Sequence, residues 1–331
     1  MEKQQVDPRE SALRGVAHLV VQEGPQRLDN FLRRSLKGVP PSLIFRIIRS
    51  GEVRIDGHRA KPTTKVVDGQ VVRVPPLRLA KPREVPPPAG GLASLSVVFD
   101  DESLIVVDKP SGVAVHGGSG LSWGVIEWLR AHWPRAERWE LVHRLDRDTS
   151  GLLVVAKTRR ALKGLQEAWR AAAVVKKYQA LAVGVLAQPR LIIRAALERY
   201  QTVQGERRVR VSAVGKPSCS EVERLAWWSA PAPGFSLVAV TLPTGRTHQI
   251  RAHLAHIGHP LVGDEKYGDF SLNKVLARQM GCHRLFLHAA ALTFPHPITG
   301  ETVTLRSPLA QELHAFLAAL GRPTGGAVPF G

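Results

Sequence analysis

The sequence predicts a chain of two domains, each built from both helices and strands. Helical spacing of apolar residues and short alternating or β-branched runs both recur along the 331 residues. Residues 81–93 contain three consecutive prolines and two consecutive glycines, a composition typical of a semi-rigid linker. We therefore expect a flexible N-terminus over 1–23, a small domain over 24–80, a larger domain over 94–322 and a flexible tail over 323–331.

The charge of the chain indicates a polyanionic partner. Lysine and arginine number 46 against 28 acidic residues, which gives a formal net charge of +18. Such an imbalance is typical of proteins that bind nucleic acid partly by counterion release. A membrane surface is the rival partner, but the sequence has no long uncharged apolar run, no signal-peptide pattern and no concentrated basic tail. A soluble, cytoplasmic, monomeric protein without a membrane partner is therefore expected.

Neither the cysteines nor the histidines indicate a metal site. Two cysteines, Cys219 and Cys282, are too few for a disulfide framework or a cysteine-based zinc site. Four histidines lie between His248 and His259, at spacings of five, three and three. They lack the His-Glu-x-x-His arrangement that binds zinc, so we expect no metal.

The predicted small domain combines two helices with hairpin-type strands. Apolar residues recur at helical spacing over Leu28–Leu36 and again over Ile44–Ile48. Ser42 is the expected N-cap of the second helix. Residues 53–59 and 68–75 alternate and turn as hairpin strands do.

This segment is also disproportionately basic, and it resembles the S4-like RNA-binding domain. Between Arg27 and Arg78 it holds 12 basic residues against 4 acidic ones. Its start matches the pattern R-L-D-x-x-L, and residues 51–57 match G-x-V-x-I-D-G. The resemblance implies RNA held by two basic helices through its backbone and shape. The side chains expected at the RNA are Arg33, Arg34, Lys37, Arg46 and Arg49. A basic but solvated domain without a ligand is the alternative.

The most informative stretch is His143–Gly151, a charged, turn-prone segment that leads directly into an apolar, β-branched run. Functional groups commonly lie on a loop that a rigid element holds in place. Asp146 and Asp148 are flanked by His143, Arg144 and Arg147. Nearby positive charge would keep a carboxylate ionised, as a nucleophile or general base requires. On spacing alone, a solvated turn before a strand is the alternative.

Residues 143–153 resemble the motif H-R-L-D-x-x-T-S-G-L-L of the RluA-type pseudouridine synthases. This resemblance implies that Asp146 is the catalytic aspartate. Residues 97–116 resemble the opening hairpin of the same family and place Lys109 and His116 at fixed positions of its pattern, where we expect substrate contacts. In the element K-x-Y-x-A the family's tyrosine stacks on the reacting base, and Tyr178 is the matching residue; without the resemblance, ordinary packing is the alternative.

A second polar cluster matches the family motif G-R-T-H-Q-I-R-x-H. The resemblance pairs the first arginine of this motif with the catalytic aspartate, so Arg246 is the expected partner of Asp146. Such a bidentate pair would orient the carboxylate and keep it charged. Ile250 is expected to pack beside the base, and Arg251 and His253 are expected on a helix face or at the RNA.

The resemblance extends from about residue 26 to residue 320 and implies an α+β catalytic domain, centred on a mixed, mostly antiparallel sheet with a cleft across it. The implied reaction converts uridine to pseudouridine within RNA without a cofactor or metal. Asp146 would act either at the sugar C1′ or through a glycal, and the sequence does not separate these routes. The uracil would detach, turn and rejoin through C5, and Arg144 would enter the space left by a base extracted from its stack.

Residues 31–51 and 204–218 resemble the branch of the family that modifies large-subunit ribosomal RNA, which is the expected partner. The pair Trp227-Trp228 has no counterpart in that branch. Transfer RNA as substrate and a non-catalytic RNA-binding assembly factor are the alternatives. A serine hydrolase using Ser150 would require a nucleophile elbow, G-x-S-x-G, that is not present there.

Overall fold

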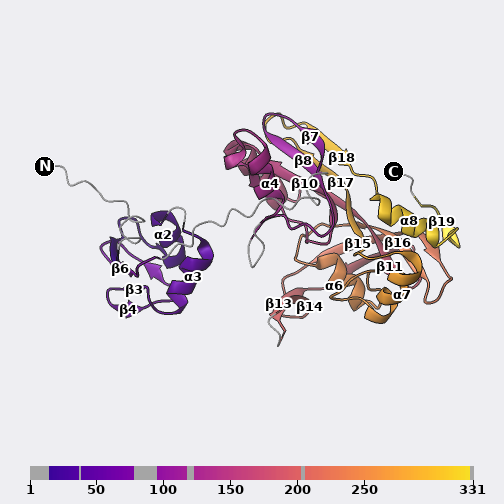
Figure 1. The fold of residues 1–331 in the computed structure, drawn as a ribbon, viewed down its shortest axis with the longest axis horizontal. Coiled ribbons are helices and arrows are strands. Elements are labelled where there is room, and N and C mark those ends of the chain that lie inside the picture. The colour runs from indigo at the N-terminus through magenta and orange to yellow at the C-terminus, as the bar shows by residue number, and fades with distance from the viewer. Residues whose placement is uncertain (1–14, 37–38, 78–94, 118–122, 203–205, 329–331) are drawn as a thin grey trace. The chain divides into compact units, whose positions relative to one another are not determined.

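The computed structural model describes residues 15–36, 39–77, 95–117, 123–202 and 206–328 (Figure 1). The chain divides into two compact units, within residues 1–84 and 85–331, and each is described by itself. The predicted linker over 81–93 lies outside the described residues. Among the helices of the described parts, none is long and apolar enough to cross a membrane.

The first unit packs two helices against a small antiparallel sheet. Four strands pair in the order β1–β6–β3–β4, and β2 pairs with β5. Its elements are β1 (Ala17–Val20), β2 (Gln26–Arg27), α2 (Leu28–Ser35), α3 (Pro41–Arg49), β3 (Arg54–Ile55), β4 (His58–Arg59), β5 (Lys65–Val66) and β6 (Val71–Val74).

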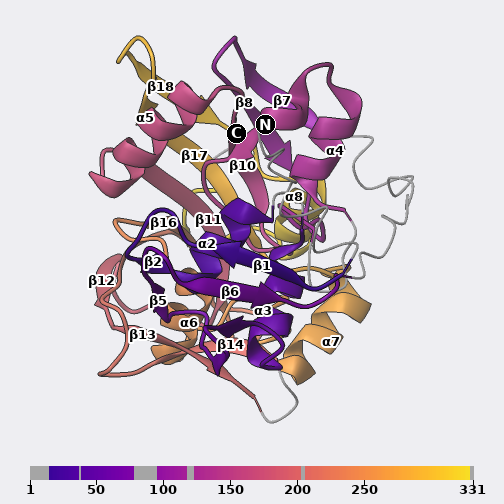
Figure 2. The ribbon, with the colours of Figure 1, turned by 90° about the vertical axis from the view of Figure 1, so that its left-hand side faces the viewer.

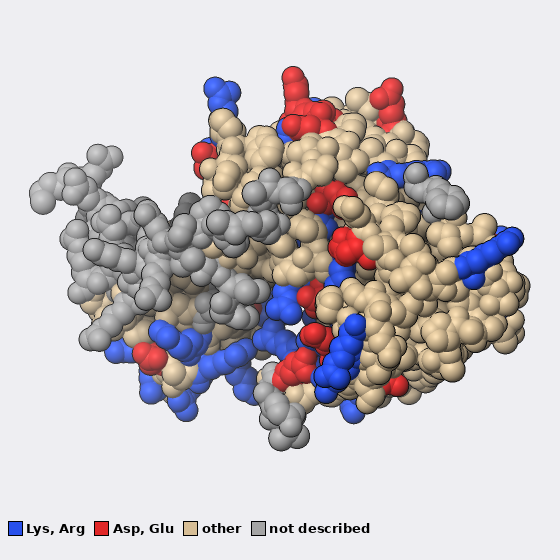
Figure 3. All heavy atoms as spheres, turned by 45° about the vertical axis from the view of Figure 1, so that its right-hand side comes forward, with Lys and Arg blue, Asp and Glu red and all other residues tan. Residues whose placement is uncertain are grey.

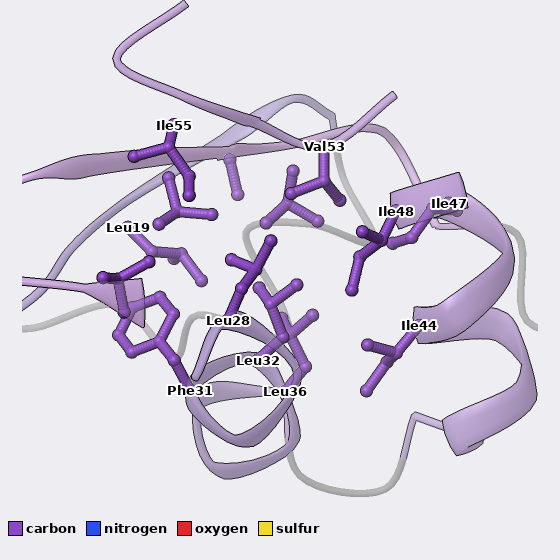
Figure 4. Close-up of a cluster of buried hydrophobic side chains, with 14 of the residues drawn as sticks. Leu19, Leu28, Phe31, Leu32, Leu36, Ile44, Ile47, Ile48, Val53 and Ile55 are labelled. Carbon is purple, nitrogen blue, oxygen red and sulfur yellow. The ribbon is translucent and has the colours of Figure 1, made fainter. Parts of the chain in front are cut away.

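One hydrophobic core holds this unit together (Figure 4). Leu28 and Leu32 of α2 and Ile44 and Ile48 of α3 are buried against Val53. These positions are three or four apart within each helix and so share one face, as the spacing in the sequence predicted. The arginines of the same helices are left on the solvent side.

Two predictions for this unit are wrong. Ser42 is not the N-cap of α3, because the helix begins at Pro41 with Pro40 at the cap position. Proline suits the first turn, where its missing N–H would have no helical acceptor. The N-terminal segment is ordered before residue 23: β1 pairs with β6 and buries Ala17 and Leu19. A four-residue strand is too short to stand out as a pattern in the sequence.

The second unit is built on an eleven-stranded sheet whose main path runs β12–β15–β16–β11–β17–β10–β8–β7. Among the described strands of this sheet, β10 and β17 form the one parallel pair, so the sheet is mixed and mostly antiparallel, as predicted. Its strands are β7 (Ser96–Asp100), β8 (Leu104–Lys109), β9 (Glu140–Leu141), β10 (Ser150–Ala156), β11 (Val175–Val183), β12 (Arg190–Arg194), β15 (Cys219–Trp228), β16 (Phe235–Thr241), β17 (Leu287–Pro295), β18 (Thr302–Arg306) and β19 (Gly325–Gly326).

Helices cover both faces of this sheet, and Figure 2 shows α5 beside its strands. On β10, Leu153 and Val155 pack in the cluster that contains α4, whereas Leu152 and Val154 pack in the cluster that contains α5. Burial on both faces explains why the strand reads as a continuous apolar run rather than an alternating one. The remaining elements are α4 (Val125–His132), the 3₁₀ turn η1 (Ala136–Arg138), α5 (Arg159–Arg170), the hairpin β13 (Leu197–Gln201) and β14 (Arg207–Val211), α6 (Gln249–His256), α7 (Phe270–Met280) and α8 (Gln311–Ala319).

The predicted flexible tail is wrong in part. β19 pairs with β15, where the N–H of Thr324 donates to the carbonyl of Trp227 at 2.7 Å. Trp228 is fully buried and its indole N–H donates to the carbonyl of Gly321 at 2.8 Å. The Trp227-Trp228 pair therefore attaches the chain beyond α8 to the sheet, which local composition did not reveal.

Candidate active site

Strand β10, which begins directly after the loop that carries Asp146, fixes the position of this loop. Gly151 has φ +107°, and a Cβ there would come within 2.3 Å of the carbonyl oxygen of Ala289 on β17. Only glycine allows β10 and β17 to pair this closely. The motif's glycine thus joins the loop that carries Asp146 to the centre of the sheet.

Tyr178 lies on β11, on the other side of β17. The register between β11 and β17 shifts there, so that Ala289 and Ala290 both stand opposite Tyr178. A β-bulge of this kind redirects a side chain locally. Burial, and secondarily the charge of Asp146, raises the pKa of the Tyr178 hydroxyl, so the group stays protonated.

Lys109 supports the Asp146 loop from the interior of the protein and does not contact solvent. Its ammonium donates to the carbonyls of Pro110 (2.8 Å), Val113 (2.8 Å) and Arg147 (2.9 Å). Three acceptors match the three N–H bonds of an ammonium. Its predicted role as a substrate contact is therefore wrong, because the side chain is fully buried, with a pKa that burial lowers to about 7.

The cation nearest to Asp146 is Arg251. Its Nη1 lies 3.5 Å from the Asp146 carboxylate, while its Nε and Nη2 both donate to Asp264 at 2.7 Å. Both Arg251 and Asp264 are buried. Burial alone would lower the pKa of Arg251, but the bonds to Asp264 raise it overall, so the guanidinium stays charged. A bidentate pair in a fixed geometry thus presents a third N–H group to Asp146.

The predicted pair between Arg246 and Asp146 is not formed. The Arg246 side chain is exposed and its nearest acceptor is the carbonyl of Pro217, at 3.4 Å. Arg246 lies in the turn before α6, whereas Arg251 lies on the face of that helix beside the buried Ile250 and Leu254. Arg251 was expected on a helix face or at the RNA; it lies on a helix face, and that face is buried.

The basic residues next to Asp146 in the sequence do not pair with it either. Arg147 pairs with Asp148 at 3.0 Å. His143 accepts a hydrogen bond from the N–H of Val154 through Nε2, and burial lowers its pKa to about 4, so it is neutral. The expectation that these neighbours hold the carboxylate in its charged form is therefore wrong.

The turn that positions α6 is held by a buried glutamine. The side-chain oxygen of Gln249 accepts from the N–H of Arg246 (3.0 Å) and the hydroxyl of Thr244 (2.9 Å). Its amide donates to the carbonyl of Cys219 on β15 at 2.8 Å. These bonds place the start of α6, and with it Arg251, against the sheet.

His248 is the second group that faces Asp146. Its Nε2 lies 3.8 Å from the carboxylate, and its Nδ1 lies 2.8 Å from the hydroxyl of Tyr267. The backbone of His248 is left-handed, with φ 51°, directly before α6. Burial lowers the pKa of His248, against the opposing effect of Asp146.

These groups surround a small recess of about 60 Å³ with Asp146 in its wall. Leu145, Tyr178 and Ile250 supply its apolar surface, which suits the faces of a planar base. Arg144 is exposed at its edge. The predicted residues Asp146, Tyr178, Ile250, Arg144 and Arg246 all line this recess.

A wider groove of about 470 Å³ continues from the recess and shares Asp146 and Tyr178 with it. Four basic side chains line it, and among the described residues none of them pairs with a carboxylate: Arg144, Arg170, Lys176 and Arg246. Figure 3 shows that charged side chains gather in clusters on a largely uncharged face. A groove with unpaired cations beside this recess suits a polyanionic chain.

The other predicted contacts lie outside this recess. His116 is exposed and its ring bonds the carbonyl of Gly117 at 2.8 Å. His253 lies on a buried face of α6 and its ring bonds Ser218 and Ser220, so of the two expected positions, a helix face or the RNA, it takes the first. In the first unit Arg33, Arg34, Arg46 and Arg49 are exposed, and Lys37 lies outside the described residues. No group of three or more potential metal ligands occurs within the described ranges.

Sequence reasoning missed Arg251, Asp264, His248 and Tyr267 as members of the site. The sequence did contain a sign that Arg251 and Asp264 are buried. Arg251 lies beside the apolar face of α6, and Asp264 follows the buried Leu261 and Val262. A charge on a buried face requires a partner of opposite charge.

Comparisons with known proteins identify the family of this chain. Residues 103–256 match the family model described as RNA pseudouridylate synthase, and residues 26–72 match the S4 domain. The chain belongs to the RNA pseudouridine synthase family.

Among its curated relatives is ribosomal large subunit pseudouridine synthase C of Yersinia pestis, 49% identical over 90% of this chain and 93% of that protein. The protein of the same name from Haemophilus influenzae is 47% identical over 90% of this chain and 92% of that protein. The solved structure of human RNA pseudouridylate synthase domain containing 1 is 27% identical, covers 70% of this chain and 96% of that one, and superposes with a TM-score of 0.56.

Proposed function

We propose that this enzyme converts specific uridines of large-subunit ribosomal RNA to pseudouridine, with Asp146 as the reacting carboxylate. The observation that carries the substrate is the similarity to relatives named for that RNA, at 47–49% identity over 90% of the chain. The net charge of +18 and the basic groove beside Asp146 support a large polyanion as substrate.

The residues of the recess take the following roles in this proposal. The reaction breaks the N1–C1′ bond, forms a C5–C1′ bond, and moves one proton from C5 to N1, so it requires no cofactor. Asp146 is the nucleophile or base that opens the first bond. Arg251, charged and fixed by Asp264, directs an N–H group at Asp146, and Tyr178 stacks on the uracil.

The target base must leave its stack before it can reach Asp146. Arg144 is exposed at the mouth of the recess and is the side chain that enters the vacated space. Arg246, also at the mouth, binds the RNA backbone in the groove. His116 makes a similar contact from its exposed position.

The small domain binds the same RNA through its helices. Residues 26–72 match the S4 domain, and the exposed Arg33, Arg34, Arg46 and Arg49 lie on α2 and α3. Contacts of this kind strengthen binding without reading sequence. We propose that the enzyme acts as a monomer in the cytoplasm.

Mapping pseudouridine in ribosomal RNA from cells that lack this protein tests the proposal. We expect specific large-subunit sites to be lost, then restored by wild type but not by Asp146→Asn. Asp148→Asn is the matched control, because Asp148 pairs with Arg147 and does not line the recess, and it should restore the sites.

Restoration by Asp146→Asn would refute the role of Asp146. Unchanged large-subunit RNA would refute the substrate and direct the search to transfer RNA. If sites were lost but restored equally by every variant, a non-catalytic assembly factor would be the better description.

A further inference from the structure

We infer that His248 is a positioning residue for Asp146, and that Tyr267 holds its imidazole in the one neutral form that directs an N–H group at the carboxylate. The inference deepens the proposed function, because it rests on Asp146 being the reacting group. The resemblance and the comparisons give these two residues no role.

The hydroxyl of Tyr267 determines which ring nitrogen of His248 carries the proton. This hydroxyl accepts a hydrogen bond from the N–H of Val209 at 2.9 Å. Its own proton then points to Nδ1 of His248, at 2.8 Å. An Nδ1 that accepts a hydrogen bond is unprotonated, so in the neutral ring the proton lies on Nε2.

Nε2 is the nitrogen that faces Asp146, 3.8 Å from Oδ2. The Nη1 of Arg251 approaches the same oxygen, at 3.5 Å. Among the described residues no donor approaches Oδ1 of Asp146. Two donors directed at one oxygen favour one orientation of the carboxylate and leave the other oxygen free to react. Both distances exceed a normal hydrogen bond, as is common in a site without its substrate.

Tyr267 is itself fixed by three separate contacts. Its N–H donates to Asp264 at 3.0 Å, the carboxylate that also binds Arg251. Its ring lies 5.3 Å below the Arg251 guanidinium. Its hydroxyl is attached to β14 of the hairpin through Val209. Asp264 therefore organises both donors that reach Asp146.

The second attachment of the hairpin lies next to His248. Arg199 on β13 donates to the hydroxyl of Thr247 at 2.6 Å. The left-handed backbone of His248 places its ring under Tyr267, and a non-glycine residue keeps such a conformation only where its surroundings impose it. The hairpin thus supplies the restraint that keeps the imidazole in place.

The alternative state of His248 is the protonated, cationic ring. Some of the charged groups around the ring favour this cation and others disfavour it. Asp146 and Asp264 favour the cation, whereas Arg251 and Lys266 disfavour it, and burial disfavours it most. A cationic ring would also leave the Tyr267 proton without an acceptor among the described residues. The neutral ring with its proton on Nε2 gives the Tyr267 proton an acceptor and turns an N–H group toward Asp146.

Nitrogen-15 NMR of the full chain, labelled at histidine, tests the tautomer without any substrate. The two ring nitrogens of a neutral histidine differ in shift according to which one is protonated, and a His248→Gln spectrum assigns the signals. We expect protonated Nε2 and bare Nδ1 in wild type, and a mixture of both forms in Tyr267→Phe. A proton on Nδ1 in wild type would overturn the inference.

Single-turnover rates on large-subunit RNA test the consequence for Asp146. We expect His248→Ala to lower the maximal rate about 10- to 100-fold and Tyr267→Phe to lower it about 3- to 10-fold, with the Kd for RNA changed less than 2-fold. His248→Gln should recover part of the rate, because its amide nitrogen replaces the Nε2 donor and does not depend on Tyr267. Tyr267→Phe should therefore have little further effect in that background.

Tyr200→Phe is the matched control, because Tyr200 lies on β13 of the same hairpin and stacks with Arg210 away from the recess. It should keep the wild-type rate. Full activity of His248→Ala, or an equal effect of Tyr267→Phe with and without His248→Gln, would overturn the inference. Inactive wild-type protein would refute the proposed substrate instead, while the NMR result would still decide the tautomer.

Discussion

Arg251 reaches Asp146 with one nitrogen, at 3.5 Å, while its other two guanidinium nitrogens are bound to Asp264. The charge beside the reacting carboxylate therefore depends on a third residue. A lysine at this position keeps the charge but cannot reproduce three directed N–H groups.

Arg251→Lys should lower the maximal rate at least 10-fold and the free energy of unfolding by about 1–3 kcal/mol, because Asp264 loses a bidentate partner. Arg251→Met should cost about 3–5 kcal/mol, since it leaves a buried carboxylate unpaired. Urea unfolding and single-turnover kinetics measure both effects. Arg246→Lys is the control: exposed and bound weakly to Pro217, it should weaken RNA binding and leave the stability within about 0.5 kcal/mol of wild type. A larger loss of rate for Arg246→Lys than for Arg251→Lys would show that the arginine beside Asp146 changes when RNA binds.

Lys109→Met should destabilise the protein and abolish activity together. The substitution keeps the volume but removes the donor for three carbonyls, one of which belongs to Arg147 in the Asp146 loop. We expect a loss of about 2–4 kcal/mol in urea unfolding. Lys177→Met, at an exposed lysine of β11, should change the stability by less than about 0.5 kcal/mol. A Lys109→Met protein with wild-type activity would show that the loop does not need this support.

Comparing the stability of Gly151→Ala with that of Gly112→Ala distinguishes the effect of backbone strain from the effect of close packing. Both glycines have positive φ, but a Cβ at Gly112 meets nothing within 4 Å, whereas one at Gly151 meets the backbone of Ala289. Gly112→Ala should cost about 1–2 kcal/mol from conformation alone. Gly151→Ala should cost more than about 3 kcal/mol, because β10 and β17 must also separate. Equal losses in thermal or urea unfolding would contradict the packing argument.

Stability should fall as the pH falls from 6.5 to 4, in part because of His143. Burial lowers the pKa of its imidazole from 6.5 to about 4 in the folded protein. Between these values the unfolded chain binds a proton at His143 that the folded chain does not, so the contribution of His143 to stability rises with pH in this window and is constant above it. The full effect is on the order of 3 kcal/mol.

The comparison with His143→Gln isolates this group from the other buried histidines. Glutamine accepts the Val154 hydrogen bond without titrating. Wild type should therefore lose stability relative to the variant when urea unfolding is measured at pH 7, 5.5 and 4.5. A constant difference across this range would show that His143 is not the titrating group.

The family, the α+β class, the place of Asp146 in a loop before a strand and the two helices of the first unit could all be predicted from the sequence. These follow from local pattern: apolar residues at helical spacing bury α2 and α3, and the apolar run at 152–156 is a strand buried on both faces. The turn of the G-x-V-x-I-D-G hairpin depends on its own backbone, which a local motif specifies.

Which cation lies beside Asp146 depends on the tertiary structure and could not be predicted from the sequence. His143, Arg144 and Arg147 are its neighbours in the chain, yet the group that reaches it is Arg251 on a distant helix, fixed by Asp264. Lys109 was expected at the substrate and His253 on a helix face or at the RNA. Both are buried, because backbone carbonyls and serine hydroxyls of other segments satisfy them. A buried charge is stable only where its partners converge in space, and that convergence depends on the packing of elements far apart in the sequence.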